Sequence, residues 1–132
     1  MTKRPKIREY MAATLVTLPP EMEILRAMEI LLAERISGAP VVDAAGKLVG
    51  VLSKKDCLKA ALNACYHQQW GGAVADYMSS PVETMEADLD IVEAAERFLA
   101  GHYRRFPVVE EGRLTGQISR ADLLRALVDN WR

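Results

Sequence analysis

The chain of 132 residues has few of the residue types on which metal and nucleophilic chemistry depend. It contains two cysteines and two histidines, and aromatic residues make up 6% of it. Cys57 and Cys65 fall in one predicted helix, about 12 Å apart along its axis, so they cannot form a disulfide with each other. No C-x-x-C pair accompanies them, which argues against a zinc site. We expect buried structural thiols in a reducing compartment.

Long apolar runs and an excess of one charge are missing as well. No stretch approaches the roughly 20 apolar residues that a membrane-spanning helix needs, and no apolar region follows the basic N-terminus. The net charge of −1 leaves no overall field to attract nucleic acid or an anionic membrane. We therefore expect a globular, cytoplasmic protein with no nucleic-acid or membrane partner. The one feature that favours nucleic acid is a basic leader with Lys3, Arg4, Lys6 and Arg8.

The motifs of the common catalytic classes are absent too. There is no G-x-S-x-G, no phosphate-binding lysine loop, no G-x-G-x-x-G after a predicted strand and no H-E-x-x-H. His67 and His102 have no evident serine or cysteine nucleophile to act on. We predict that the chain is not an enzyme and has no catalytic residue, catalytic cofactor or metal site.

The sequence does contain an internal repeat, in which one unit occurs twice, and this repeat indicates the fold. Residues before the hairpin turn pair at an offset of 67, as Pro40-Val41-Val42 does with Pro107-Val108-Val109. After the turn the offset is 66, which pairs Ser53 with Ser119 and Asp56 with Asp122. We predict a leader at 1–10, a first repeat at 11–68, a linker at 69–77 and a second repeat at 78–132.

Each copy has the pattern β-α-β-β-α. Short extended segments at 15–17 and 82–84 precede two amphipathic helices, whose apolar residues recur at i, i+3, i+4, i+7 and i+8 from Ile24 and from Ile91. Two apolar runs joined by a glycine turn then predict a hairpin, followed by a helix from Asp56 or Asp122. A unit this small is marginal alone. The predicted fold class is therefore α+β (α/β-like), with two repeats packed sheet to sheet about a pseudo-twofold axis.

The second helix of each copy carries a broad apolar face. Its members occupy i, i+1, i+4, i+5 and i+8. One face consists of Cys57, Leu58, Ala61, Leu62 and Cys65, and the other of Leu123, Leu124, Leu127, Val128 and Trp131. Such a face either belongs to the core or forms a self-association surface, since two similar patches suit an isologous homodimer. The pattern leaves both interpretations open.

The residues that could hold a ligand are two Ser-x-x-Asp motifs, Ser53-Lys54-Lys55-Asp56 and Ser119-Arg120-Ala121-Asp122, each between a strand and a helix. One interpretation is a helix cap, in which the serine and the acidic residue satisfy free amide groups. The other is that the carboxylate accepts hydrogen bonds from a ribose diol, while the hydroxyl and the helix amides hold phosphate. Spacing does not separate the two. Arg104 and Arg105, ahead of the second hairpin, are likewise either solvated or a phosphate clamp.

The duplicated "PVV…G…G…S-x-x-D", in "ISGAPVVDAAGKLVGVLSKKD" and "YRRFPVVEEGRLTGQISRAD", resembles a tandem pair of CBS domains, or Bateman module, over residues 6–127. The resemblance implies a regulatory module that binds AMP, ADP, ATP or S-adenosylmethionine in two clefts between the repeats, commonly as a homodimer. Because little sequence lies outside the repeats, we expect a stand-alone module that signals to a separate, unknown effector protein. The alternative is a ligand-free scaffold protein with vestigial clefts.

The resemblance also implies which residues form the two composite sites. One site joins Ser53, Lys54 and Asp56 to Tyr103, Arg104 and Arg105, with Pro81, Val82 and Glu83 beside the adenine. The other joins Ser119, Arg120 and Asp122 to Ile36 and Ser37, with Thr14, Leu15 and Val16 beside the base. The first set holds more basic residues, and charge-assisted hydrogen bonds are about twice as strong as neutral ones. We therefore expect a phosphorylated nucleotide to prefer the Asp56 site.

Overall fold

The contacts of the chain divide it into two compact units. The computed structural model describes residues 4–68 and 71–131. We name the units by their aspartates: the Asp56 unit is Val16–Val82, and the Asp122 unit joins Met1–Leu15 to Glu83–Arg132. The start of the predicted leader (1–3), two positions of the predicted linker (69–70) and the last residue of the predicted second repeat (132) lie outside the described residues.

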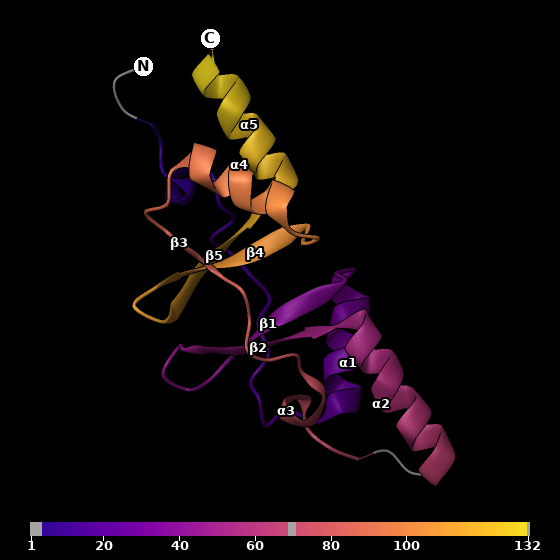
Figure 1. Ribbon diagram of the computed structural model, residues 1–132. Helices are drawn as coiled ribbons and strands as arrows, with labels where there is room; N and C mark the ends of the chain where they lie inside the picture. The colour runs from indigo at the N-terminus through magenta and orange to yellow at the C-terminus, as the bar shows by residue number, and fades with distance from the viewer. Residues whose placement is uncertain (1–3, 69–70, 132) are drawn as a thin grey trace. The chain divides into compact units, whose positions relative to one another are not determined.

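The Asp56 unit consists of a hairpin and three helices. Strand β1 (Gly38–Val42) pairs antiparallel with β2 (Leu48–Ser53), and helices α1 (Ile24–Glu34) and α2 (Lys54–His67) lie side by side (Figure 1). The short helix α3 (Val74–Tyr77) follows. The predicted apolar stripe of α1 is confirmed at i, i+3 and i+7, which are in the core with residues of the hairpin, and is wrong at i+8, because Leu32 is 71% exposed, as the equivalent Leu99 is to 87%. That core contains Leu18, Ile24, Ala27, Leu31, Ala39, Val41, Leu52, Ala60 and Val74.

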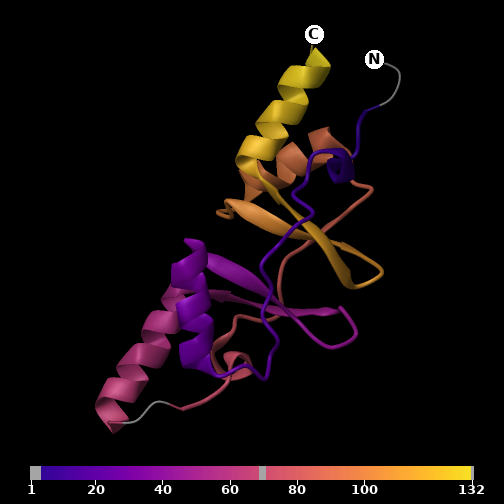
Figure 2. The ribbon, with the colours of Figure 1, turned by 180° about the vertical axis from the view of Figure 1, so that it is seen from behind.

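The Asp122 unit repeats this plan with a longer sheet. Strand β3 (Met85–Glu86) runs parallel to β4 (Arg105–Glu110), which pairs antiparallel with β5 (Arg113–Ser119). Helices α4 (Ile91–Ala100) and α5 (Arg120–Trp131) lie beside the sheet, and a 3₁₀ helix, η1 (Ile7–Glu9), joins them from the N-terminus (Figure 2). The core includes Ile7, Met85, Ile91, Phe98, Phe106, Ile118 and Leu123. The predicted α+β class is confirmed in both units.

The two hairpins match in detail, as the repeat predicts. Each turn contains a glycine with positive φ, 83° at Gly46 and 79° at Gly112. Each hairpin also has a register shift at the equivalent valine pair. The last pair of each ladder sets Gly38 opposite Ser53 and Arg105 opposite Ser119. Gly38 and Arg105, which occupy equivalent positions in the two copies, therefore lie directly across from the serines of the Ser-x-x-Asp motifs.

The first strand of each copy lies later than predicted. The segments at 15–17 and 82–84 are not strands. Pairing instead occurs at Leu18, which bridges Val41, and at Met85–Glu86, which pairs with β4. Pro20 ends the first pairing after one residue, because it has no N–H to donate to β1, whereas the equivalent Ala87 donates its N–H to the Val109 carbonyl at 3.1 Å. The helices α2 and α5 also begin two residues earlier than predicted, since the serine is already at the cap position.

Each repeat is preceded by a short lead-in segment, around Ile7 for the first and around Val74 for the second, which packs against the helices and strands of the other repeat. Ile7 and Val74 are equivalent at the offset of 67. Ile7 is buried in the core of the Asp122 unit, and its N–H donates to the Leu89 carbonyl at 2.9 Å. Val74 is buried in the core of the Asp56 unit, and its N–H donates to the Met22 carbonyl at 2.8 Å. The two units therefore exchange their lead-in segments.

Candidate functional site

The Asp56 corner, which we define as Ser53, Asp56 and Ser79, lies where β2 meets α2. The N–H and Oγ of Ser53 both donate to Asp56 Oδ2 at 2.9 Å, and the Asp56 N–H donates to Ser53 Oγ at 3.1 Å. The predicted cap is thus confirmed, with Ser53 as the N-cap of α2. Ser79 Oγ lies 3.4 Å from both carboxylate oxygens, which is long for an O–H···O hydrogen bond. Within the described part of the chain, Oδ1 of Asp56 accepts only this long contact.

The Asp122 corner, which we define as Ser119, Asp122 and Arg125, has the same cap with a different partner. The Ser119 N–H donates to Asp122 Oδ2 at 2.9 Å, and the Asp122 N–H donates to Ser119 Oγ at 3.2 Å. Arg125 Nη2 donates to the other carboxylate oxygen, Oδ1, at 2.9 Å. Both oxygens of Asp122 therefore accept a short hydrogen bond, one of them from a cation.

The two partners that distinguish the corners were not predicted from the sequence. Ser79 is equivalent to Ala12 at the offset of 67, and Arg125 is equivalent to Lys59 at the offset of 66. Ala12 has no hydroxyl, and Lys59 forms no ion pair among residues 4–68 and 71–131. The signal was available at Arg125, because a basic residue three positions after an aspartate on a helix can reach it.

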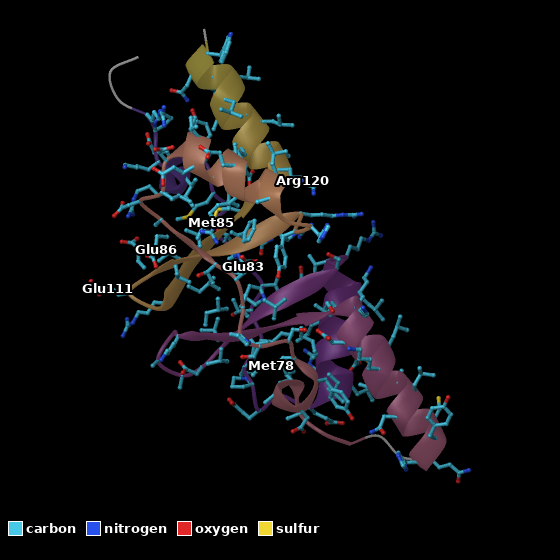
Figure 3. The ribbon with its side chains drawn as sticks, viewed as in Figure 1. Met78, Glu83, Met85, Glu86, Glu111 and Arg120 are labelled. Atoms are coloured by element: carbon cyan, nitrogen blue, oxygen red, sulfur yellow. The ribbon has the colours of Figure 1, made fainter. Side chains whose placement is uncertain are left out.

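The loops before the hairpins lie next to the cap of their own unit. The Lys54 N–H donates to the Ser37 carbonyl at 2.9 Å, and the Arg120 N–H donates to the Arg104 carbonyl at 3.3 Å. Figure 3 shows Arg120 at the start of α5. Ile36 and Ser37 are therefore in the Asp56 unit, and Tyr103, Arg104 and Arg105 are in the Asp122 unit. The predicted sites each join a loop of one unit to the corner of the other, and that pairing stays a prediction.

The predicted base-side segments begin next to the corners to which they were assigned. Ser79 and Val51 exchange backbone hydrogen bonds of 2.9 and 3.1 Å, two residues before Pro81 and Ser53 respectively. Ala12 and Gln117 make the equivalent pair, both at 2.9 Å, two residues before Thr14 and Ser119 respectively. Leu15 belongs to the same unit as Thr14, whereas Val16 falls in the Asp56 unit and Glu83 in the Asp122 unit.

Charged and aromatic groups surround the two corners unequally. Lys54 and Lys55 are exposed at the start of α2, and Arg104 and Arg105 are exposed where β4 begins. The Tyr103 ring lies 5.2 Å from the Phe106 ring and is half exposed. Burial, together with the negative charge of Asp56, raises the pKa of the Cys57 thiol. No group of three or more metal-binding side chains occurs in the described ranges.

Two arginines of the basic leader pair with carboxylates of their own unit. Arg8 donates to Asp88 at 2.7 Å and to Glu110 at 3.0 Å, and Arg4 lies 3.7 Å from Asp90. The hydrogen bonds to Glu110 and Asp88 raise the pKa of the Arg8 guanidinium, and the bond from Arg8 lowers the pKa of Asp88. Lys3 lies outside the described residues. Two of the four basic side chains thus fix the leader to the unit, which weakens the case for a polyanion site.

Comparisons with known proteins point to one family. The CBS domain family matches the chain twice, at residues 7–63 and 74–129. The crystal structure of CBSX2 in complex with AMP is 28% identical with a TM-score of 0.82, covering 96% of this chain and 98% of that chain. A structure of CBSX2 from Arabidopsis thaliana is 26% identical with a TM-score of 0.81, covering 96% of both chains.

One curated relative is the uncharacterized protein MJ1225 of Methanocaldococcus jannaschii, 28% identical over 125 residues. The match covers 95% of this chain and 44% of that protein. The zinc metalloprotease MJ0392 of the same organism is 36% identical over 125 residues, which is 95% of this chain and 33% of the protease. The chain therefore spans less than half the length of these two relatives.

Proposed function

The chain belongs to the CBS domain family, with two CBS domains in tandem, and on this premise we propose that it is a non-catalytic regulatory module for an adenosine-containing ligand. The ligand is AMP, ADP, ATP or S-adenosylmethionine, and its binding is signalled to an effector protein. The observation that carries this proposal is the similarity to CBSX2, which binds AMP and matches this chain along nearly its whole length. Ligand biases the effector only if it binds two arrangements of the module with different affinity.

We assign the ribose to the two aspartates. A carboxylate at a strand-to-helix junction can accept hydrogen bonds from both ribose hydroxyls, as acidic residues do in dinucleotide-binding folds. Oδ1 of Asp56 accepts only a long contact among residues 4–68 and 71–131, so it has acceptor capacity left for a diol. The Ser-x-x-Asp cap and ribose binding are compatible, because the cap uses Oδ2.

Phosphate groups are assigned to basic side chains and to the start of α2. The N-terminus of a helix attracts anions through its free N–H groups and its dipole. Lys54 at this position is exposed, as are Arg104 and Arg105 in the loop predicted to complete the same site. Adenine stacks in this proposal beside Pro81, Val82 and Glu83. The second site uses Ser119, Arg120 and Asp122 with the residues predicted for it.

We also propose that the module is a homodimer that associates through α2 and α5. Ala60, Ala64, Leu123 and Ala126 supply the buried face of these helices. Within the broad apolar faces, Leu58, Leu124 and Trp131 are exposed to 66%, 63% and 87%, whereas Cys57, Ala61 and Leu127 are half-buried. An open apolar groove on α5 is lined by Leu124, Leu127, Val128 and Trp131. A single mass of one chain in sedimentation equilibrium at high micromolar concentration would contradict the dimer.

The proposed module works in the cytoplasm without a nucleic-acid or membrane partner. Two arginines of its basic leader, Arg4 and Arg8, are paired with carboxylates, which reduces the positive charge available to a polyanion. In the part of the chain that the structure describes, no helix has the length and apolarity to cross a membrane.

Melting temperatures with and without millimolar AMP, ADP, ATP and S-adenosylmethionine test the function, with GTP as the control. A ligand at a hundredfold excess over its dissociation constant adds about 2.7 kcal/mol, which raises the melting temperature by several degrees. We expect a shift with an adenosine ligand, a smaller shift in Asp56→Asn and none with GTP. If no adenosine ligand shifts the wild-type protein, the scaffold alternative is correct and both Ser-x-x-Asp motifs are helix caps only.

A further inference from the structure

We propose that Arg125 is a specificity-determining residue, which lowers the affinity of the Asp122 corner for a ribose diol by occupying the carboxylate oxygen that the diol needs. The inference rests on the proposed adenosine binding, which it refines. It concerns a residue outside both Ser-x-x-Asp motifs and predicts that the two sites of the module are unequal.

The geometry of the carboxylate supports this competition. Asp122 Oδ1 accepts the hydrogen bond from Arg125 at 2.9 Å, and Oδ2 accepts that from the Ser119 N–H at 2.9 Å. A diol donates two hydrogen bonds, so it must displace or share the guanidinium bond on Oδ1. A ribose hydroxyl on Asp122 Oδ1 also makes a charge-assisted hydrogen bond, but displacing Arg125 gives up the attraction between two opposite charges, so the hydroxyl replaces the guanidinium at a loss.

Among the residues that the structure describes, none competes in this way at the Asp56 corner. Its extra donor is the neutral hydroxyl of Ser79 at 3.4 Å, a contact that a ligand hydroxyl replaces with gain. Lys59, the residue equivalent to Arg125, is exposed and makes no ion pair within residues 4–68 and 71–131. The Oδ1 atom of the aspartate therefore accepts only a long contact from a neutral hydroxyl in one copy and a short hydrogen bond from a cation in the other.

Arg125 can be displaced without being left unpaired. Its Nη2 also lies 3.4 Å from the Tyr10 carbonyl oxygen, so an acceptor remains when Asp122 turns to a ligand. The side chain of Arg125 is 55% exposed and that of Asp122 is 18% exposed, so water screens the pair. Exposed ion pairs of this kind are weak, and we expect removal of Arg125 to tighten diol binding on the order of threefold.

Calorimetric titration with adenosine and with 2′,3′-dideoxyadenosine tests the proposal. The Asp56→Asn protein leaves the Asp122 corner as the reporting site. We expect Asp56→Asn/Arg125→Met to bind adenosine about threefold more tightly than Asp56→Asn alone, in line with the strength of such pairs. The dideoxynucleoside should bind both proteins equally because it has no diol. The matched control is Asp56→Asn/Lys59→Met, which removes a positive charge from the equivalent helix position and should leave adenosine affinity unchanged.

The outcomes separate this inference from the function on which it rests. If the wild-type protein binds none of adenosine, AMP, ADP, ATP and S-adenosylmethionine, the proposed function is wrong and the inference falls with it. If the wild type binds AMP and Arg125→Met leaves adenosine affinity at the Asp122 corner unchanged or weaker, the inference alone is overturned. A loss of AMP affinity with adenosine affinity unchanged would also overturn it, because Arg125 would then be a phosphate contact. Circular dichroism of each variant checks that it is folded.

Discussion

The two Ser-x-x-Asp corners share their backbone geometry and differ in what holds the carboxylate. In both, the serine N–H donates to Oδ2 of the aspartate at 2.9 Å, so the cap is the same. Ser79 approaches Asp56 as a neutral donor, whereas Arg125 approaches Asp122 as a cation. The motif thus determines the cap, and a residue outside the motif determines what the carboxylate has left for a ligand.

The loops opposite the two serines also differ in charge, with the cationic loop again in the Asp122 unit. The Asp56 unit has Ile36-Ser37-Gly38 at this place, and the Asp122 unit has Tyr103-Arg104-Arg105. One copy thus presents a neutral loop and the other a cationic, aromatic one on the same backbone. A duplicated fold with unequal side chains is suited to two sites of different affinity.

The largest expected effect comes from the exchanged lead-in segments. Ile7→Ala removes a fully buried side chain from the core of the Asp122 unit and should cost about 3 kcal/mol of unfolding free energy in urea denaturation. The matched variant Val74→Ala, in the Asp56 unit, should cost about 2 kcal/mol because fewer atoms are lost. Hydrogen exchange should rise mainly in α4 and α5 for the first and in α1 and α2 for the second. The opposite assignment would contradict the exchange of segments.

The next effect distinguishes the glycines on the second strand of each hairpin. A Cβ at Gly116 would lie 2.8 Å from the Ala12 carbonyl oxygen, and one at Gly50 would lie 3.0 Å from the Ser79 carbonyl oxygen. Figure 3 places Met78, which also meets the Gly50 position, just after α3. Both alanine variants should lose stability through overpacking, about 2 kcal/mol at Gly116 and less at Gly50. Urea unfolding measures both variants. A smaller loss of stability at Gly116 than at Gly50 would contradict this order and show that the segment around Ala12 shifts to make room for the added methyl group.

The caps should differ by a smaller amount. Asp56 is 5% exposed and accepts from both the N–H and the hydroxyl of Ser53, so Asp56→Ala leaves buried donors unpaired. Asp122→Ala leaves one such donor and frees Arg125 to solvent. We expect Asp56→Ala to lose about 1 kcal/mol more than Asp122→Ala. Thermal unfolding of both variants checks this, and equal losses would mean that the burial of Asp56 carries no extra cost.

The smallest expected effect is on thiol reactivity. Burial and the charge of Asp56 raise the pKa of Cys57, so its thiolate forms only at higher pH, and Cys65 is exposed. At pH 8 iodoacetamide should alkylate Cys65 first, and the rate at Cys57 should still be rising with pH above that value. Mass spectrometry of timed samples measures both sites. Faster modification at Cys57 would contradict the burial of this side of α2.

Most of the fold could be predicted from the sequence because the duplication shows each element twice. The glycine turns, the α1 and α4 stripes and the Ser53 cap all follow from local spacing that tertiary contacts do not alter. The exchange of the lead-in segments could not be predicted, because Ile7 and Val74 occupy the same place in the pattern. The sequence pattern is equally consistent with Ile7 packing in the core of either unit, and the same holds for Val74. The early end of the first strand depends on Pro20, because its missing N–H interrupts a pairing that the extended pattern alone would continue.

The site was predictable in its motifs and not in its carboxylate partners. Ser-x-x-Asp indicates a cap wherever it follows a strand, and both caps form. Ser79 reaches Asp56 from a segment 23 positions away along the chain, a contact that only the folded backbone creates. Arg125 lies at helical spacing from Asp122, yet Lys59 at the equivalent place makes no ion pair in the described ranges. Spacing permits such a pair without requiring it.

A nuclear magnetic resonance titration of the ¹⁵N-labelled protein with AMP is the sharpest test of adenosine binding at two unequal corners, because it reports the amides of both at once. We expect the amides of residues 53–57 to shift at lower AMP concentration than those of residues 119–123. In Arg125→Met the two groups should shift at more similar concentrations. No shift in either group would contradict adenosine binding. Shifts at residues 119–123 that begin at lower AMP concentration than those at residues 53–57 would contradict the proposed order of the two corners.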